Sequence, residues 1–313
     1  MRVVVLGATG TVGRSAVPAL VGAGHDVLAH ARSAYAAARL TATGATPLLG
    51  DSDDPRTLRE WLRGADAAVD LRVAVPAASR AMSPWAWREY ERLRGEATRA
   101  LVDAALREEV ARVVHDTVTM VYADGRSTPL TEGAPVDAPG ALAANLRAEE
   151  QLARVTAAGG AGVALRLAPL YGPDDEHSAQ VAAGARRGRV PLLGPLDGWT
   201  SALHTDDAGP AVLTALTAPA GVYNVADDEP LTRRVVLALL ADAAGVRTVR
   251  GLPEALLHVA PAPLRALGRS HRVDAGRFRA LGWQPRVRSR RTGWRLVVTG
   301  AAADRVAAPV LRA

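Results

Sequence analysis

Three glycines near the start of the chain have the spacing of a phosphate-binding turn. Gly7, Gly10 and Gly13 follow the apolar run Val3-Val4-Val5-Leu6 and open a segment of helical periodicity. One glycine permits the tight turn, one lets the backbone approach a pyrophosphate, and one lets the helix pack on the strand. The helix N-terminus offers free N–H groups and a positive dipole to the phosphates. The alternative is a turn kept only for packing. The predicted dinucleotide site comprises Gly7, Thr9, Gly10, Thr11, Val12 and Gly13.

The end of the second apolar run bears on the choice between NAD and NADP. An acidic residue at this place would bond the ribose 2′-hydroxyl of NAD. The chain has His30-Ala31-Arg32-Ser33 and no carboxylate, so Arg32 is expected to meet a 2′-phosphate, and NADP is favoured over NAD. Because 38 of the 313 residues are arginine, the alternative is an ordinary surface arginine.

Charged residues interrupt two apolar runs near their carboxyl ends. Asp70 and Arg72 interrupt one run, and His115 and Asp116 the other. Parallel strands that are covered on both faces should be continuously apolar. An unpaired buried carboxylate is costly, so Asp70 and Asp116 should be paired, hydrogen-bonded or protonated. Such departures are often functional, which suggests acid/base chemistry, but a structural ion-pair network would leave the same pattern.

Apolar runs that alternate with helical periodicity predict the elements that position these residues. Strands are expected at 2–6, 26–30, 46–49, 67–71, 112–117 and 163–167, and helices at about 12–23, 55–63, 84–108 and 141–158. Beyond residue 172 we expect a helix from about Asp206, a strand at 222–225 and a helix at 231–244. The predicted fold class is α/β, a doubly wound parallel-sheet Rossmann domain (1–171) with a smaller, mixed C-terminal substrate lobe (172–313). Residues 203–226 are expected to return to the Rossmann domain.

Composition excludes several classes of function. The chain has no Cys and no Lys, so thiolate nucleophiles, Cys-ligated zinc and Schiff-base chemistry are ruled out. The net charge is +6, but the arginines are dispersed among acidic residues, and no nucleic-acid partner is expected. His115, His177 and His204 lack metal-site spacing, so no metal is expected. No apolar run approaches the roughly 18 residues of a membrane span, and no signal peptide is recognisable. We therefore expect no membrane partner and a cytoplasmic location.

Seven motifs, in order along nearly the whole chain, resemble the extended short-chain dehydrogenase/reductase family, in its NAD-dependent epimerase/dehydratase branch. They are GxxGxxG at 7–13, GD at 50–51, VYG at 121–123 (here Val-Tyr-Ala), LRxxxxYGP at 165–173, hVxD at 204–207 (without its Val), GxYNv at 221–225 and LGWxP at 281–285. The resemblance implies bound NADP or NAD, a small-molecule substrate in the cleft at the carboxyl ends of the strands, and a homodimer. It also implies that Asp51 contacts adenine, with Ser52, Leu71 and Arg72 near the cofactor. Arg72 replaces a small residue there, so it either grips a phosphate or blocks the site.

The catalytic Asn, Ser or Thr, Tyr and Lys of that family have no counterparts in this chain. Aligned through their neighbours, the four positions hold Arg94, Val118, Ala141 and Asn145. In the family the Tyr acts as general acid/base, and the Lys lowers its pKa. We therefore predict that this tetrad is missing.

Other residues can be considered as substitutes. Thr117 and Thr119 flank Val118, and two tyrosines, Tyr90 and Tyr122, lie four residues before an arginine. Arg is a poor mimic of Lys because it is a planar fork, not a compact charge. A second hypothesis is a polar network of Asp70, Arg72, Arg94, Asp116 and Asn145, in or beneath the pocket, that supplies carboxylate acid/base chemistry. The catalytic candidates are Asp70, Arg94, Asp116, Asn145, Thr117 and Tyr122.

The expected function is that of a small-molecule enzyme of the NAD(P)-dependent epimerase/dehydratase/reductase superfamily, in specialised metabolism. Without the tetrad its mechanism is expected to be non-standard and need not be redox. The alternative is a non-catalytic NADP-binding regulatory protein, and a third reading is a scaffold that has lost the cofactor.

Overall fold

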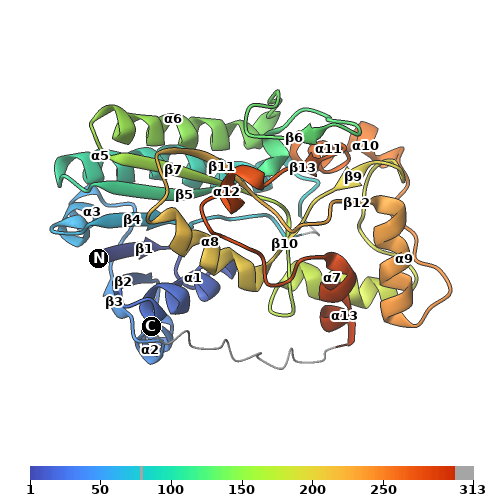
Figure 1. The fold of residues 1–313 in the computed structure, drawn as a ribbon, viewed down its shortest axis with the longest axis horizontal. Helices are drawn as coiled ribbons and strands as arrows, with labels where there is room; N and C mark the ends of the chain where they lie inside the picture. The colour runs from blue at the N-terminus through green and yellow to red at the C-terminus, as the bar shows by residue number, and fades with distance from the viewer. Residues whose placement is uncertain (78–79, 300–313) are drawn as a thin grey trace.

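A parallel sheet of seven strands forms the centre of the computed structural model, which describes residues 1–77 and 80–299 (Figure 1). Its strand order, β11-β7-β5-β4-β1-β2-β3, reverses direction between β1 and β4, which is typical of a doubly wound sheet. The strands are β1 (Arg2–Leu6), β2 (Asp26–Ala31), β3 (Thr46–Leu49), β4 (Ala67–Asp70), β5 (Arg112–Val118), β7 (Ala161–Leu167) and β11 (Gly221–Val225). The predicted α/β fold class is confirmed, and the six strands predicted before residue 171 differ from the observed ones by at most two residues at either end.

Helices cover both faces of this sheet, because side chains along each strand alternate between two apolar clusters. Val3 and Val5 of β1 pack in the cluster under α1, α2 and α8, whereas Val4 and Leu6 pack under α3, α5 and α6. These helices are α1 (Thr11–Gly22), α2 (Ala34–Ala42), α3 (Pro55–Leu62), α5 (Thr98–Arg107), α6 (Ala143–Ala157) and α8 (Thr205–Ala215). Helix α2 was not predicted, because its alanine-rich sequence has little periodicity. Its one local signal is Ser33, whose side chain accepts the N–H of Ala36 at the helix start.

The segment predicted as one helix at 84–108 is helical throughout but irregular. A 3-10 turn (Pro84–Trp87) leads into α4 (Arg88–Arg92), and a π-helical turn (Leu93–Ala97) joins α4 to α5. The Thr98 hydroxyl donates to the carbonyl of Leu93 across that turn at 3.1 Å. Single π turns inside α-helices often occur at functional sites.

The C-terminal part of the chain adds a smaller group of elements beside the carboxyl ends of the strands (Figure 1). Helices α7 (Glu176–Arg186), α9 (Arg233–Ala244) and α13 (Arg290–Thr299) share one apolar cluster. The remaining elements are short: β6 (Pro129–Leu130), β8 (Leu170–Tyr171), β9 (Trp199–Thr200), β10 (Leu203–His204), β12 (Leu231–Thr232), β13 (Arg272–Val273), α10 (Leu256–Val259), α11 (Ala262–Leu267) and α12 (Gly276–Arg279).

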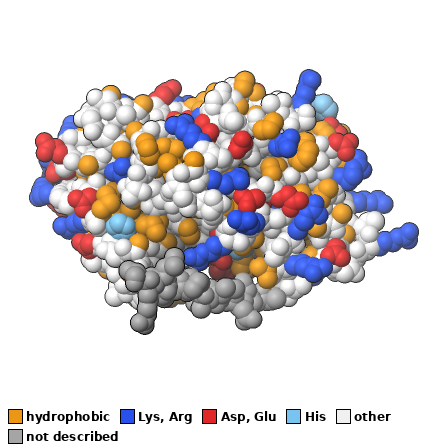
Figure 2. Space-filling model, in the orientation of Figure 1, with side chains coloured by type: hydrophobic (Ala, Val, Ile, Leu, Met, Phe, Trp, Pro, Cys, Tyr) orange, Lys and Arg blue, Asp and Glu red, His pale blue; other side chains and the backbone are white. Residues whose placement is uncertain are grey.

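The surface is mixed in charge. Basic and acidic side chains are interspersed over the face shown in Figure 2. Within residues 1–77 and 80–299, no helix is long and apolar enough to cross a membrane.

Candidate active site and cofactor cradle

The glycine turn between β1 and α1 has the geometry of a phosphate cradle. Gly7 has a φ of +73°, and a Cβ there would stand 2.4 Å from the carbonyl carbon of Leu71. A Cβ on Gly13 would stand 2.3 Å from the carbonyl oxygen of Gly7, so the helix can pack on the turn only without a side chain. The Gly10 N–H donates to the Gly7 carbonyl at 3.0 Å. No side chain caps α1, and its first turn holds no acidic residue, so its N–H groups fit the pyrophosphate of NAD(P).

The residues expected near the adenosine end lie at the carboxyl edge of the sheet. Arg32 follows β2 directly and is exposed, and no described residue pairs with its guanidinium. Asp51 is exposed as well, and its Oδ1 accepts the N–H of Asp53 at 2.9 Å. The carbonyl of Ser52 accepts a hydrogen bond from Arg72 at 3.1 Å.

Arg72 is fully engaged by protein acceptors. Its Nε and Nη2 donate to the two carboxylate oxygens of Asp70, each at 2.8 Å. Its remaining N–H groups reach Ser52 and Asp53 from Nη1, and the carbonyl of Ala97 from Nη2. A guanidinium has five N–H groups, and all five are used here, so none is left for a phosphate in this arrangement.

A second buried ion pair lies under the π turn. Arg94 donates from Nη1 and Nη2 to the two oxygens of Asp116, at 2.9 and 3.1 Å. Arg94 is 1% exposed and Asp116 4%. Burial raises the pKa of the Asp116 carboxyl, against the opposing effect of the Arg94 charge. Because both oxygens are held by a fixed cation, the carboxylate is suited to hold the π turn against β5.

His115 connects the two ion pairs. It faces Asp70 in the register of β4 and β5, and its Nε2 lies 3.1 Å from Nη1 of Arg94. Arginine can only donate, so Nε2 must accept and the ring proton must sit on Nδ1, which lies 3.7 Å from Oδ2 of Asp70. Burial lowers the pKa of His115 to about 3, helped by Arg94 and Arg72, so the ring is neutral. Burial alone would raise the pKa of Asp70, but Arg72 outweighs it and holds the value at about 2.

The structure thus brings Asp70, Arg72, Arg94 and Asp116 together, as the sequence suggested. His115 was not among the predicted members of this network. The available signal was the strand register, which places His115 opposite Asp70.

An apolar cluster occupies the positions that we predicted to align with the family's hydroxyl residues. Val118 ends β5, and Ala141 lies in the 3-10 turn Gly140–Leu142 before α6. We call this cluster the apolar wall. Its buried members are Ala81, Trp87, Tyr90, Ala141, Leu142 and Ala266, and its partly exposed members are Val118, Met120, Ala138 and Leu264. The wall joins the end of β5, the start of α6, the α4 region and α11.

Asn145 lies behind this wall and contacts Tyr90, not the ion pairs. Its Nδ2 donates to the Tyr90 hydroxyl at 2.8 Å and to the carbonyl of Leu142 at 3.0 Å. Its Oδ1 is buried, and among the residues described it has no hydrogen-bond partner.

The hydroxyls of Thr117 and Tyr122 are hydrogen-bonded to side chains of α6 and β11. The Thr117 hydroxyl donates to Glu149 at 3.2 Å, and Glu149 forms an ion pair with Arg166 at 2.6 Å. The Tyr122 hydroxyl donates to Oδ1 of Asn224 at 2.7 Å, and its ring lies under the Arg166 guanidinium. Both hydroxyls are therefore committed to contacts within the fold.

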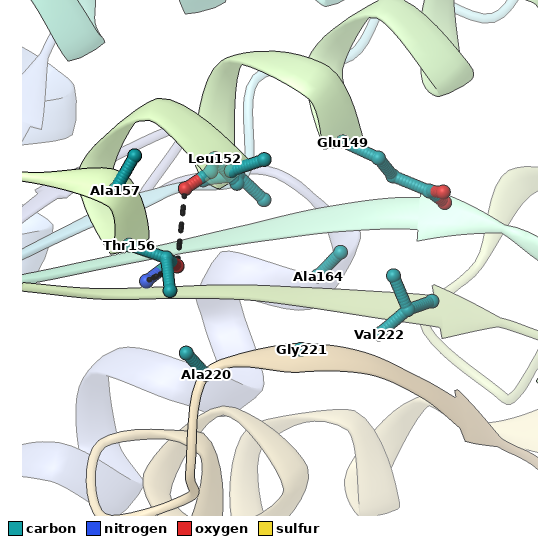
Figure 3. A pocket seen from close by; sticks show the side chains of 10 residues that line it. Glu149, Leu152, Thr156, Ala157, Ala164, Ala220, Gly221 and Val222 are labelled. Carbon is teal, nitrogen blue, oxygen red and sulfur yellow. Dashed lines mark hydrogen bonds between the residues drawn. The ribbon is translucent and has the colours of Figure 1, made fainter.

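A surface pocket of about 460 Å³ lies elsewhere, between α6 and the edge of the sheet. Figure 3 shows Leu152 and Thr156 of α6 facing Ala164 of β7 and Val222 of β11. Its charged lining residue is Glu149, which Arg166 neutralises. In the part of the chain that the structure describes, no group of three or more His, Cys, Asp or Glu side chains is placed to hold a metal ion.

The parallel sheet and its glycine cradle define a dinucleotide-binding α/β protein of the Rossmann class. Residues 3–226 match the model of the NAD dependent epimerase/dehydratase family. The chain belongs to this family, as its motifs predicted.

Known proteins similar to this chain include two reductases and an epimerase. The chain is 35% identical over 314 residues (94% of the chain, 99% of the relative) to the 3-diazoavenalumate denitrifying reductase of a Streptomyces species. It is 30% identical over 290 residues (89% and 85%) to the 4-hydroxy-2-methyl-3-oxo-4-farnesyl-3,4-dihydroquinoline-1-oxide ketoreductase of Stigmatella aurantiaca. Its fold is similar to that of the Thermus thermophilus UDP-glucose 4-epimerase in complex with NAD, with a TM-score of 0.75, 22% identity and coverage of 96% and 100%.

Proposed function

We propose that the protein is an NADPH-dependent reductase of an apolar small molecule in specialised metabolism. The observation that carries this proposal is the apolar wall at the carboxyl end of β5. Val118 and Ala141 of this wall are the residues predicted to replace the family's Ser/Thr and Tyr. A wall of this kind, at the same edge of the sheet as the glycine cradle, suits an apolar substrate beside the nicotinamide. A reduced nicotinamide cofactor held by the cradle would supply the hydride.

Similarity supports reduction over epimerisation or dehydration. The two relatives that share 30% or more identity over about nine-tenths of the chain are both named reductases. The epimerase shares 22% identity, which supports the fold alone.

The hydride acceptor is either a carbonyl or a diazo-type group. A ketone needs a proton on its oxygen when hydride adds to its carbon. An arenediazonium ion needs none, because addition of hydride gives an arene and dinitrogen. One relative is named for a ketone substrate and the other for a diazo substrate, so both classes are to be tested.

The two buried ion pairs support the site and do not supply its protons. Each carboxylate, Asp70 and Asp116, is held at both oxygens by an arginine. This arrangement favours a structural ion-pair network over acid/base chemistry by the two carboxylates. Asp116→Asn should leave turnover within about tenfold of wild type, whereas general acid/base groups contribute about 10²–10⁴-fold.

The test follows the oxidation of NADPH with three probes: ethyl 2-methylacetoacetate, 9,10-phenanthrenequinone and benzenediazonium. Rates are corrected for the reaction without protein, and NADPH binding is measured separately by nicotinamide fluorescence and by the shift in melting temperature. Protein-dependent oxidation with at least one probe supports the proposal. NADPH binding without oxidation would favour the regulatory alternative, and the absence of binding would favour a scaffold.

A further inference from the structure

We infer that Tyr90 is the proton donor of this site for a carbonyl substrate, supplied by α4 in place of the family's tyrosine before α6. The inference rests on the proposed reductase function. It comes from the way in which Tyr90 and Asn145, far apart in sequence, meet at the apolar wall.

The position of Tyr90 is the first argument. Its ring belongs to the same cluster as Val118 and Ala141, and it packs edge-on against Trp87 at 5.7 Å between ring centroids. Ala141 has only a methyl group at the position where the family resemblance predicts a tyrosine ring. A tyrosine from the neighbouring α4 therefore lies in the cluster from which that ring is missing.

The hydrogen bonding of the Tyr90 oxygen is the second argument. It accepts from Nδ2 of Asn145, the residue that aligns with the family's Lys. The other Nδ2 hydrogen goes to the Leu142 carbonyl, which fixes the orientation of the amide. Among the residues described, the Tyr90 hydroxyl accepts from Asn145 and has no acceptor for its own proton, and Oδ1 of Asn145 is buried without a donor. The proton of the Tyr90 hydroxyl is therefore left for an acceptor outside the fold, and a carbonyl oxygen is such an acceptor.

The charge around Tyr90 is the third argument. The Arg94 guanidinium carbon lies 5.9 Å from the ring centroid. Burial raises the pKa of Tyr90, so the hydroxyl is protonated at neutral pH, as a donor must be. Arg94 and Asn145 act in the opposite direction and stabilise the phenolate that remains after transfer.

The step balances in atoms and charge. A bound reduced nicotinamide would supply a hydride to the carbonyl carbon, and the carbonyl π electrons would then form an O–H bond with the proton that Tyr90 gives up. The products are an alcohol, the oxidised cofactor and a phenolate, which regains a proton from water.

Tyr90→Phe tests the inference, because it removes the hydroxyl and keeps the ring. With the keto ester or the quinone, kcat should fall by about 10²–10⁴-fold, while KM and NADPH affinity stay within about twofold. Reduction of benzenediazonium, which needs no proton, should be retained. The matched control is Tyr223→Phe, which removes the hydroxyl of another buried tyrosine, bonded to the Pro219 carbonyl on the opposite face of the sheet. It should leave both activities unchanged.

Other outcomes overturn the inference in distinguishable ways. Carbonyl reduction that survives Tyr90→Phe, with the variant folded by its melting curve, removes Tyr90 from proton transfer and leaves the reductase function standing. A wild-type protein that reduces only benzenediazonium does the same. A wild-type protein that reduces none of the probes overturns both the inference and the proposed function.

Discussion

Arg94 and Asp116 form a two-point ion pair, with nitrogen–oxygen distances of 2.9 and 3.1 Å, between a π-helical turn and β5. Arg94 is the residue at the position where the family resemblance predicts the Asn of a catalytic tetrad. It lies directly behind Tyr90, so one arginine both neutralises a buried carboxylate and places positive charge near the apolar wall.

Breaking this pair should destabilise the protein strongly. Arg94→Leu leaves Asp116 buried without its cation, and loss of one partner of a buried pair costs about 3–5 kcal/mol. Replacing both residues by Leu should recover most of that loss in urea denaturation. Arg234→Ala, at the exposed pair with Asp197, is the control and should cost under about 1 kcal/mol. If Arg94→Leu costs no more than the control, the buried pair is not structural.

The glycine cradle should fail when Gly13 gains a methyl group. A Cβ there meets the Gly7 carbonyl at 2.3 Å and the Ala8 backbone at 2.5 Å, so Gly13→Ala must displace the turn. We expect the melting shift produced by NADPH to disappear. Gly22→Ala, at the other end of α1 with nothing within 4 Å, should keep it. An intact shift in Gly13→Ala would mean that the cofactor binds elsewhere.

Arg32 should set the preference for NADPH. Its guanidinium is exposed and unpaired with any described residue, and hydrogen bonds to charged groups contribute about 1.5–3 kcal/mol. Arg32→Ala should therefore weaken NADPH binding by about 10- to 100-fold and leave NADH binding unchanged, as measured by fluorescence titration. Arg39→Ala on the exposed face of α2 should change neither. Equal losses for both cofactors would contradict 2′-phosphate recognition.

Asp227 should make stability depend on pH. Burial raises the pKa of its carboxyl from the ordinary value of 3.8 to about 7, despite the opposing charge of Arg290. The folded state therefore holds a proton that the unfolded state releases, and stability is lost as pH rises from about 4 to about 7. Neutral Asn avoids this loss, so Asp227→Asn should gain stability relative to wild type across that window and then level off.

The measurement for Asp227 is the difference in unfolding free energy between Asp227→Asn and wild type at each pH. Taking the difference cancels the opposing contribution of His115, whose pKa is lowered by burial. Asp26→Asn, at an exposed position, should show no such trend. A constant difference from pH 4 to pH 8 would show that Asp227 is not a buried, proton-binding carboxyl.

The strands of the sheet and the glycine cradle could be predicted from the sequence, because each is formed by residues that are close together in the chain. The run before Gly7 and the glycine spacing are local signals, and the predicted bounds of β1 and β3 match the structure. Helix α2 escaped prediction because alanines lie on both its buried and its exposed face, which leaves little hydrophobic contrast in the sequence. The domain boundary near residue 171 and the catalytic roles of the candidate residues remain predictions.

The amino-acid pattern alone determined the sheet, the cradle and the presence of two carboxylates on buried strands, since apolar periodicity and turn chemistry act over a few residues. Only the tertiary structure decided which partners those carboxylates took. Arg72 forms an ion pair with Asp70, Arg94 forms an ion pair with Asp116, and Tyr90 is hydrogen-bonded to Asn145 from another helix. In a chain with 38 arginines, many pairings are compatible with the sequence, and packing of helices onto the sheet selects among them because each buried charge must be neutralised where it lies.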